Sequence, residues 1–143
     1  MVYTEKTKLA MKLCFKAHKE QVDKSGVPYV FHPIHLAEQM LDEETTIVAL
    51  LHDVVEDTDY TISDLREMGF PETVLEAILL MTHNKDVPYM EYVERIKRNR
   101  IASIVKRADL MHNSDLSRLD SVDEKALKRV EKYKRAIELL ETR

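Results

Sequence analysis

Hydrophobic residues recur every three or four positions along most of this chain, which is the spacing of amphipathic α-helices. The pattern predicts helices over about residues 4–22, 33–41, 45–57, 61–68, 72–81, 89–100, 101–113 and 122–141. One short apolar run, residues 29–31, could be mistaken for a strand, but the chain offers no second run with which it could pair. With only 2 Gly and 4 Pro among 143 residues, the sequence predicts an all-α fold.

The helical pattern conflicts with the side chains in one place. The apolar run 47–51 continues directly into His52, Asp53, Glu56 and Asp57. In a helix over 45–57 these side chains would project from adjacent turns. Three carboxylates beside an imidazole at a buried helix end would repel one another unless a cation or shared protons neutralised them. The stretch therefore predicts a metal site.

A further carboxylate lies among the core positions of a later helix. Asp109 stands beside the predicted buried stripe of the helix over 101–113, which is formed by Ile101, Ile104, Val105, Ala108 and Met111. A buried carboxylate must find a cation or several donors, because leaving it unpaired is expensive.

Four residues on three predicted helices are candidate metal ligands: His32, His52, Asp53 and Asp109. Two imidazoles and two carboxylates without a thiolate suit a divalent ion of the manganese, iron or cobalt type. Such an ion could polarise a phosphorus centre and activate water. Glu56 and Asp57 would then be spare carboxylates, able to orient that water and to move its proton.

A purely structural interpretation is open for each residue taken alone. His52 and Asp53 could form a helix-end ion pair, His32 could cap a helix, and Asp109 could pair with Lys106 or Arg107. The joint pattern favours the metal, because local lysines do not supply the charge that this acidic cluster needs. The remaining histidines are interpreted as surface or packing residues: His18, His35, His83 and His112.

Composition narrows the class of protein. A chain of 143 residues predicts a single domain over 1–143. The formal net charge of -4 argues against nucleic acid as a partner, and no uncharged stretch is long enough to span a bilayer. Cys14 is the only cysteine, which excludes an intramolecular disulfide and fits a cytoplasmic protein. The oligomeric state is left open.

Five stretches together resemble a known family. They are Ala17-His18 with Gln21, the Lys-Ser-Gly-Val-Pro-Tyr of 24–29, His32-Pro33, residues 49–58 and residues 105–113. A histidine, then adjacent His-Asp, then a distant Asp is the signature of the HD superfamily of metal-dependent phosphohydrolases. The sequence around this signature is similar to that of the hydrolase domain of RelA/SpoT-type alarmone enzymes, over most of the chain from about Leu9 to Leu119.

The resemblance implies a helical domain that binds manganese and removes pyrophosphate from the 3′ position of guanosine tetra- and pentaphosphate. It implies the same metal ligands, with Glu56 and Asp57 as the catalytic pair. It also implies that Lys24 and Ser25 line the nucleotide pocket and that Asn113 contacts the nucleoside. No synthetase domain follows, so the chain resembles a small stand-alone hydrolase of a small-molecule nucleotide.

Three positions depart from the family pattern. Asp23 stands where an Arg is usual, Leu116 where a Thr is common, and His83 where a Lys follows Thr82. The candidate replacement cations are Lys19, Lys85, Lys106 and Arg118. Two alternatives therefore stay open: hydrolysis of another phosphorylated nucleotide or dinucleotide cofactor, and a metal-dependent nucleotide sensor without turnover. Retention of both Glu56 and Asp57 argues against the sensor.

Overall fold

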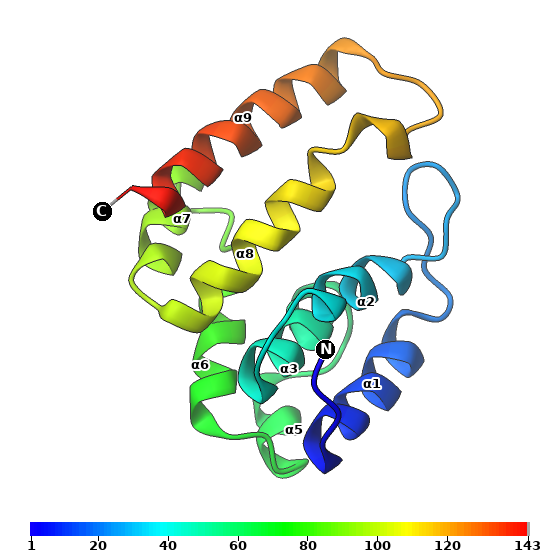
Figure 1. Cartoon of the computed structure of the whole chain (residues 1–143), viewed down its shortest axis with the longest axis vertical. Coiled ribbons are helices and arrows are strands. Elements are labelled where there is room, and N and C mark those ends of the chain that lie inside the picture. The colour runs from blue at the N-terminus through cyan, green and yellow to red at the C-terminus, as the bar shows by residue number, and fades with distance from the viewer. Residues whose placement is uncertain (143) are drawn as a thin grey trace.

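The computed structural model describes residues 1–142, and its regular structure is entirely helical (Figure 1). The helices are α1 Glu5–His18, α2 Phe31–Glu38, α3 Glu43–Leu51, α4 Val54–Asp57, α5 Ile62–Glu67, α6 Glu72–Met81, α7 Tyr89–Lys97, α8 Arg100–Asn113 and α9 Glu124–Glu141, with a 3-10 turn η1 at Leu116–Arg118. Within 1–142 the only β pairing is a single antiparallel bridge between Val22 and Pro28. The predicted all-α fold is confirmed.

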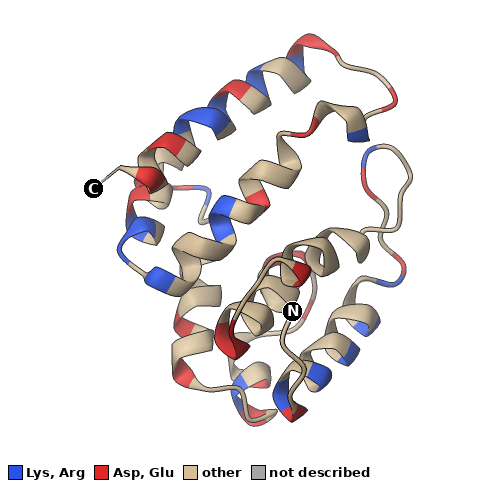
Figure 2. Ribbon diagram, in the orientation of Figure 1, with Lys and Arg blue, Asp and Glu red and all other residues tan. Residues whose placement is uncertain are grey.

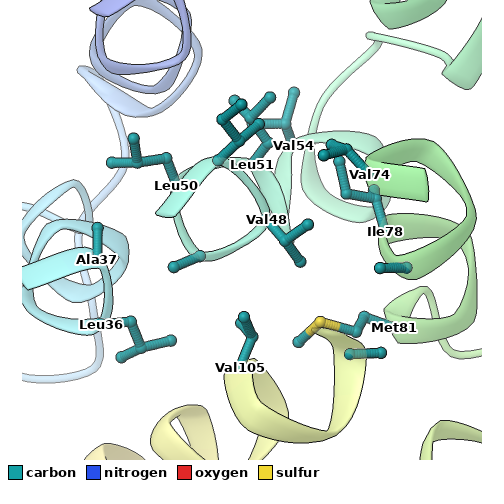
Figure 3. Packing of buried hydrophobic residues seen from close by; sticks show 14 of the residues in the cluster. Leu36, Ala37, Val48, Leu50, Leu51, Val54, Val74, Ile78, Met81 and Val105 are labelled. Carbon is teal, nitrogen blue, oxygen red and sulfur yellow. The ribbon is translucent and has the colours of Figure 1, made fainter. Parts of the chain in front are cut away.

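Helix α3 lies at the centre of the hydrophobic core. Every side chain from 45 to 51 is buried, so α3 has no solvent face. Figure 3 shows its Val48, Leu50 and Leu51 surrounded by side chains from α2, α6 and α8. Helix α1 packs on α3 as well, and α9 covers α7 and α8 (Figure 1). Charged residues gather on the outer faces of α1, α7 and α9, whereas the ribbon of α2 is almost free of them (Figure 2).

Local sequence explains several helix ends. Thr4 and Thr61 each accept a hydrogen bond from a backbone N–H in the first turn, so both form the capping boxes that begin α1 and α5. Gly69 ends the turn after α5 with φ of 95°, a conformation that favours glycine. Helix α6 has the bounds that the sequence predicts.

Other boundaries differ from the prediction. Helix α1 stops at His18 rather than near Val22, because the chain folds back in a loop in which Tyr29 N–H bonds to Gln21 O. Helix α2 begins at Phe31, so His32 lies inside its first turn instead of capping it. The cap of α3 is Asp42, whose carboxylate accepts the Thr45 N–H, so the helix begins before the predicted Thr45.

The most consequential difference concerns the predicted helix over 45–57. It is interrupted: α3 ends at Leu51, His52 and Asp53 form a turn, and α4 starts at Val54. Two predicted core residues of α8 are also solvent-exposed, with 41% of Ile104 and 51% of Met111 accessible. The buried face of α8 is therefore narrower than the apolar pattern indicates, and Asp109 lies within it. No helix within 1–142 combines the length and apolarity needed to cross a membrane.

Candidate active site

The interruption after α3 sets the direction of the first candidate ligand. His52 is the C-cap residue of α3, and its Nδ1 lies 2.8 Å from the carbonyl oxygen of Ala49. A carbonyl oxygen only accepts, so Nδ1 carries a proton and donates. This contact orients the ring so that Nε2, in the neutral form, can bind a metal.

Helices α2 and α8 bring two more ligands to the same place. His32 Nε2 lies 2.8 Å from Asp109 Oδ1, and the same oxygen lies 3.6 Å from His52 Nε2. His32, His52 and Asp109 each offer one ligand atom, and these atoms all lie within 4.8 Å of one another. Their exposed fractions are only 4%, 2% and 5%, respectively, so the cluster is buried.

The donor set fits a divalent cation. His52 Nε2 is buried without a hydrogen-bond partner among the described residues, although Asp53 Oδ2 lies 3.0 Å away and out of line for such a bond. An unsatisfied buried nitrogen is costly, and a metal would satisfy it. Nitrogen and oxygen donors without sulfur suit manganese, iron or cobalt better than a soft ion.

Asp53 borders this cluster. Its Oδ2 accepts a hydrogen bond from the hydroxyl of Tyr29, which belongs to the loop between α1 and α2. Asp53 thus contacts His52, but it is not one of the three residues whose ligand atoms all lie within 4.8 Å of one another. All four candidate ligands nevertheless come together from α2, the turn after α3, and α8.

Lys106 and Asn113 also donate to the carboxylate of Asp109. Lys106 Nζ lies 2.9 Å from Oδ2, and Asn113 Nδ2 donates to Oδ1 at 3.1 Å. Burial alone would raise the pKa of Asp109, but the lysine and both histidines outweigh it and hold that pKa well below its usual range. Asp109 is therefore an anion, and its ion pair with Lys106 coexists with the metal cluster.

The two spare carboxylates lie at the open edge of the cluster. Glu56 and Asp57 are exposed residues of α4, and Glu56 Oε1 accepts the backbone N–H of His83 at 2.9 Å. Partial burial, reinforced by the charges of Asp53 and Glu56, raises the pKa of Asp57 to about 6. A carboxyl group with this pKa can exchange protons near neutral pH.

A pocket of about 320 Å³ adjoins the cluster on the side of α9. Its lining includes Lys24 and Asn113, two of the three expected substrate-binding residues, together with Arg118. Ser25 does not line it, and its hydroxyl instead accepts the N–H of Asp120 at 3.3 Å. The Asp23 carboxylate lies 3.7 Å from Arg118, so the family departure at position 23 faces a cation.

Sequence reasoning missed part of this pocket. The pattern of α9 indicates a closing amphipathic helix without chemistry, yet Arg129 and Tyr133 of α9 line the pocket. The missed signal is that Arg129 and Tyr133 are four positions apart and thus share one face of α9. His18 was expected on the surface or in packing, and it is fully buried beside Tyr29, with ring centroids 5.1 Å apart.

Comparison with known proteins supports this geometry. Residues 10–76 match the family described as HD domain. The matched part of the chain therefore resembles an HD domain. Over 139 residues, or 93% of its length, it is 35% identical to a guanosine-3′,5′-bis(diphosphate) 3′-pyrophosphohydrolase of Aquifex aeolicus. It is also 46% identical over 66 residues, or 43% of its length, to the bifunctional (p)ppGpp synthase/hydrolase SpoT of Escherichia coli.

The fold of this chain has a solved counterpart. A metazoan ortholog of SpoT, described as hydrolysing ppGpp, superposes with a TM-score of 0.80 over 99% of this chain and 88% of the other, at 23% identity. The curated relatives are much longer: the chain spans 20% of the Aquifex protein and 9% of the Escherichia coli protein. The similarity to these relatives therefore covers only a part of each of them.

Proposed function

We propose that this chain is a manganese-dependent hydrolase that removes pyrophosphate from the 3′ position of guanosine tetra- or pentaphosphate. The observation that carries the proposal is the buried convergence of His32, His52 and Asp109 beside an unsatisfied ring nitrogen. The relatives named for this activity are long proteins, and their alignment with this chain supports the assignment of the reaction to the domain formed here.

His32, His52, Asp53 and Asp109 would hold the metal. A divalent ion there would act as a Lewis acid on the phosphoester and make a nearby water easier to ionise. The buried position of the ligands keeps competing water away from the ion, which strengthens its electrostatic effect. Manganese is proposed because its preference for mixed oxygen and nitrogen ligands agrees with this set.

Glu56 and Asp57 would perform the proton transfers. Glu56 lies at the edge of the cluster with one carboxylate oxygen bonded to His83 N, so its position is fixed while the other oxygen is free to orient the attacking water. Water attacks the 3′ phosphorus while Glu56 takes up a proton from it, and the bond from that phosphorus to the ribose 3′ oxygen breaks. Asp57, with its pKa raised to about 6, can give the leaving 3′ oxygen a proton.

Lys24, Ser25 and Asn113 are proposed to bind the nucleotide. Lys24 and Asn113 line the pocket directly, whereas Ser25 would act by holding the loop 23–28 against Asp120. Arg118 and Arg129 add positive charge to the same pocket. Four phosphates or five carry several negative charges, which these cations would neutralise.

A second candidate function is hydrolysis of a less highly charged phosphorylated nucleotide. Asp23 favours it, because its carboxylate faces Arg118 inside the pocket and offsets that positive charge. A cytoplasmic location is proposed for either function, since the free Cys14 is buried and both substrates are intracellular nucleotides.

The deciding experiment incubates purified protein with Mn²⁺ and guanosine tetraphosphate and follows pyrophosphate release. We expect release that stops when the metal is chelated. Glu56→Gln should bind Mn²⁺ as the wild type does and turn over about 100- to 10,000-fold more slowly. Intact tetraphosphate at every metal tried, with phosphate release from another nucleotide, would favour the second candidate. Tight binding of the tetraphosphate without any turnover would instead identify a sensor.

A further inference from the structure

His112 contacts the metal cluster in a way that neither the catalytic pair nor the pocket explains. Its Nδ1 lies 2.7 Å from Nδ1 of His32, on the side of that ring opposite the candidate ligand atom Nε2. The ring of His35 stacks on His112, with centroids 4.1 Å apart. His112 is half-buried, with the candidate ligand His32 as its inner contact and His35 as its stacking contact.

The geometry of the inner contact is that of a hydrogen bond within one plane. The planes of His32 and His112 are inclined by only 6° and their centroids are 5.0 Å apart. This separation exceeds the distance between the two nitrogens by about the width of one imidazole ring, so the nitrogens lie nearly in line between the centroids. Two rings stacked face to face would not have that arrangement. One nitrogen therefore donates a proton to the other.

Two histidines at the same cluster are consequently fixed by different partners. His52 donates its Nδ1 proton to the carbonyl of Ala49, which cannot donate in return. His32 has no backbone carbonyl at its Nδ1; its partner there is the ring nitrogen of His112. His32 Nε2 faces the Asp109 carboxylate at 2.8 Å and can donate to it when no metal is bound. For His32 to offer the lone pair of Nε2 to a metal instead, its proton must lie on Nδ1, and His112 must accept it.

We infer that His112 is a positioning residue that selects the Nδ1-protonated tautomer of His32 and aims its Nε2 at the metal. This inference rests on the proposed metal site. His112 is not among the candidate metal ligands, and it lines a pocket of about 360 Å³ together with His32, His35 and Arg118. Partners of this kind around metal-binding histidines commonly change metal affinity about 10- to 100-fold when they are removed.

The test compares three variants by Mn²⁺ titration calorimetry. His112→Phe keeps a flat ring between His32 and His35 but has no acceptor, and we expect it to bind Mn²⁺ about 10- to 100-fold more weakly. His112→Asn places an amide oxygen near the position of Nδ1, so it should recover most of the affinity. His35→Phe is the matched control, because it changes the ring that stacks on His112 without touching His32, and it should bind as the wild type does.

The tautomer itself provides a second readout. Long-range ¹H–¹⁵N spectra of the wild-type protein loaded with diamagnetic Zn²⁺ should show the His32 proton on Nδ1, even if the phenylalanine variant does not fold. A proton on Nε2, or wild-type affinity in a folded His112→Phe, would overturn the role of His112. Wild-type protein that binds no metal at all would instead overturn the metal site of the proposed function.

Discussion

The two halves of the candidate site are built in opposite ways. The metal half consists of His32, His52, Asp53 and Asp109, and it is attached to helices whose other side chains form the core. The nucleotide half consists of the loop 23–28, Arg118 and the pocket-facing side of α9. The first half is buried and densely bonded, whereas the second is formed by partly exposed polar side chains. The side chains of this second half can therefore be substituted without disturbing the fold.

Burial explains why the metal half is rigid. Residues 47–51 of α3 are all at most 1% exposed, so the turn that follows them has little freedom. Asp109 is tied to Lys106, Asn113 and His32 at once. Each tie places a ligand atom before any metal arrives, and such preorganisation reduces the cost of binding.

The largest effect is expected from removing a ligand of the metal half. Asp109→Ala should abolish Mn²⁺ binding and lower turnover at least about 1000-fold, because the several kcal/mol that a metal contributes to the transition state would be lost. It should also lower the free energy of unfolding by about 3 kcal/mol, since the buried Lys106 ammonium loses its carboxylate partner. Metal analysis, pyrophosphate release and denaturant unfolding measure the three quantities.

Lys106→Met is the matched control for that variant. It breaks the same ion pair but leaves Asp109 Oδ1 beside His32 and His52. We expect it to keep Mn²⁺, because removing a competing cation does not weaken the attraction of the carboxylate for the ion. Full metal content in Asp109→Ala would contradict the assignment of Asp109 as a ligand.

The two halves also differ in how far sequence reasoning could predict them. The metal half was predictable because carboxylates and imidazoles stand at positions where the hydrophobic pattern expects core residues. Each of these residues can therefore be recognised from the sequence. Arg129 and Tyr133 violate nothing, since charged and aromatic residues are ordinary on the half-exposed face of a last helix such as α9. Only the packing of that helix over α8 turns them toward the pocket.

The predictions of helix boundaries were wrong for a related reason. The helical spacing of α3 continues through His52 and Asp53, so the local sequence does not predict the turn. The turn follows from tertiary contacts: Tyr29 holds Asp53, and Asp109 attracts His52. The exposure of Ile104 and Met111 was not predicted either. It depends on how many helices pack against α8, and hydrophobic periodicity carries no information about that number.

A smaller effect is expected in the nucleotide half from Asp23→Asn. The amide can keep the loop bonds that Asp23 Oδ1 accepts from the N–H groups of Ser25 and Val27, while the charge facing Arg118 disappears. Because the pair is partly exposed, the gain in attraction for a tetraphosphate should be at most about 1 kcal/mol, which lowers KM about two- to fivefold at unchanged kcat.

Steady-state kinetics with guanosine tetraphosphate and with a nucleoside monophosphate separate the two proposed substrates. An alarmone hydrolase should show the lower KM for the tetraphosphate only, and the effect should shrink at high salt. Asp120→Asn is a suitable control, because that exposed carboxylate belongs to the neighbouring segment but does not line the pocket. A higher KM for the tetraphosphate in Asp23→Asn would mean that Asp23 helps to bind it.

An effect of similar size, on stability rather than on KM, concerns Asp57. Its pKa in the folded protein is raised to about 6, chiefly by burial, above the value of about 3.9 for an unfolded chain. A raised pKa stabilises the fold below the unfolded value, and that contribution is lost as the pH rises through about 6. Asp57→Asn should therefore match wild-type stability at pH 4 and exceed it at pH 8 by roughly 1 kcal/mol, after allowance for solvent screening at this exposed residue. Urea unfolding of the metal-free proteins at both pH values tests this, and an equal difference at the two would show that the Asp57 charge is not destabilised in the fold.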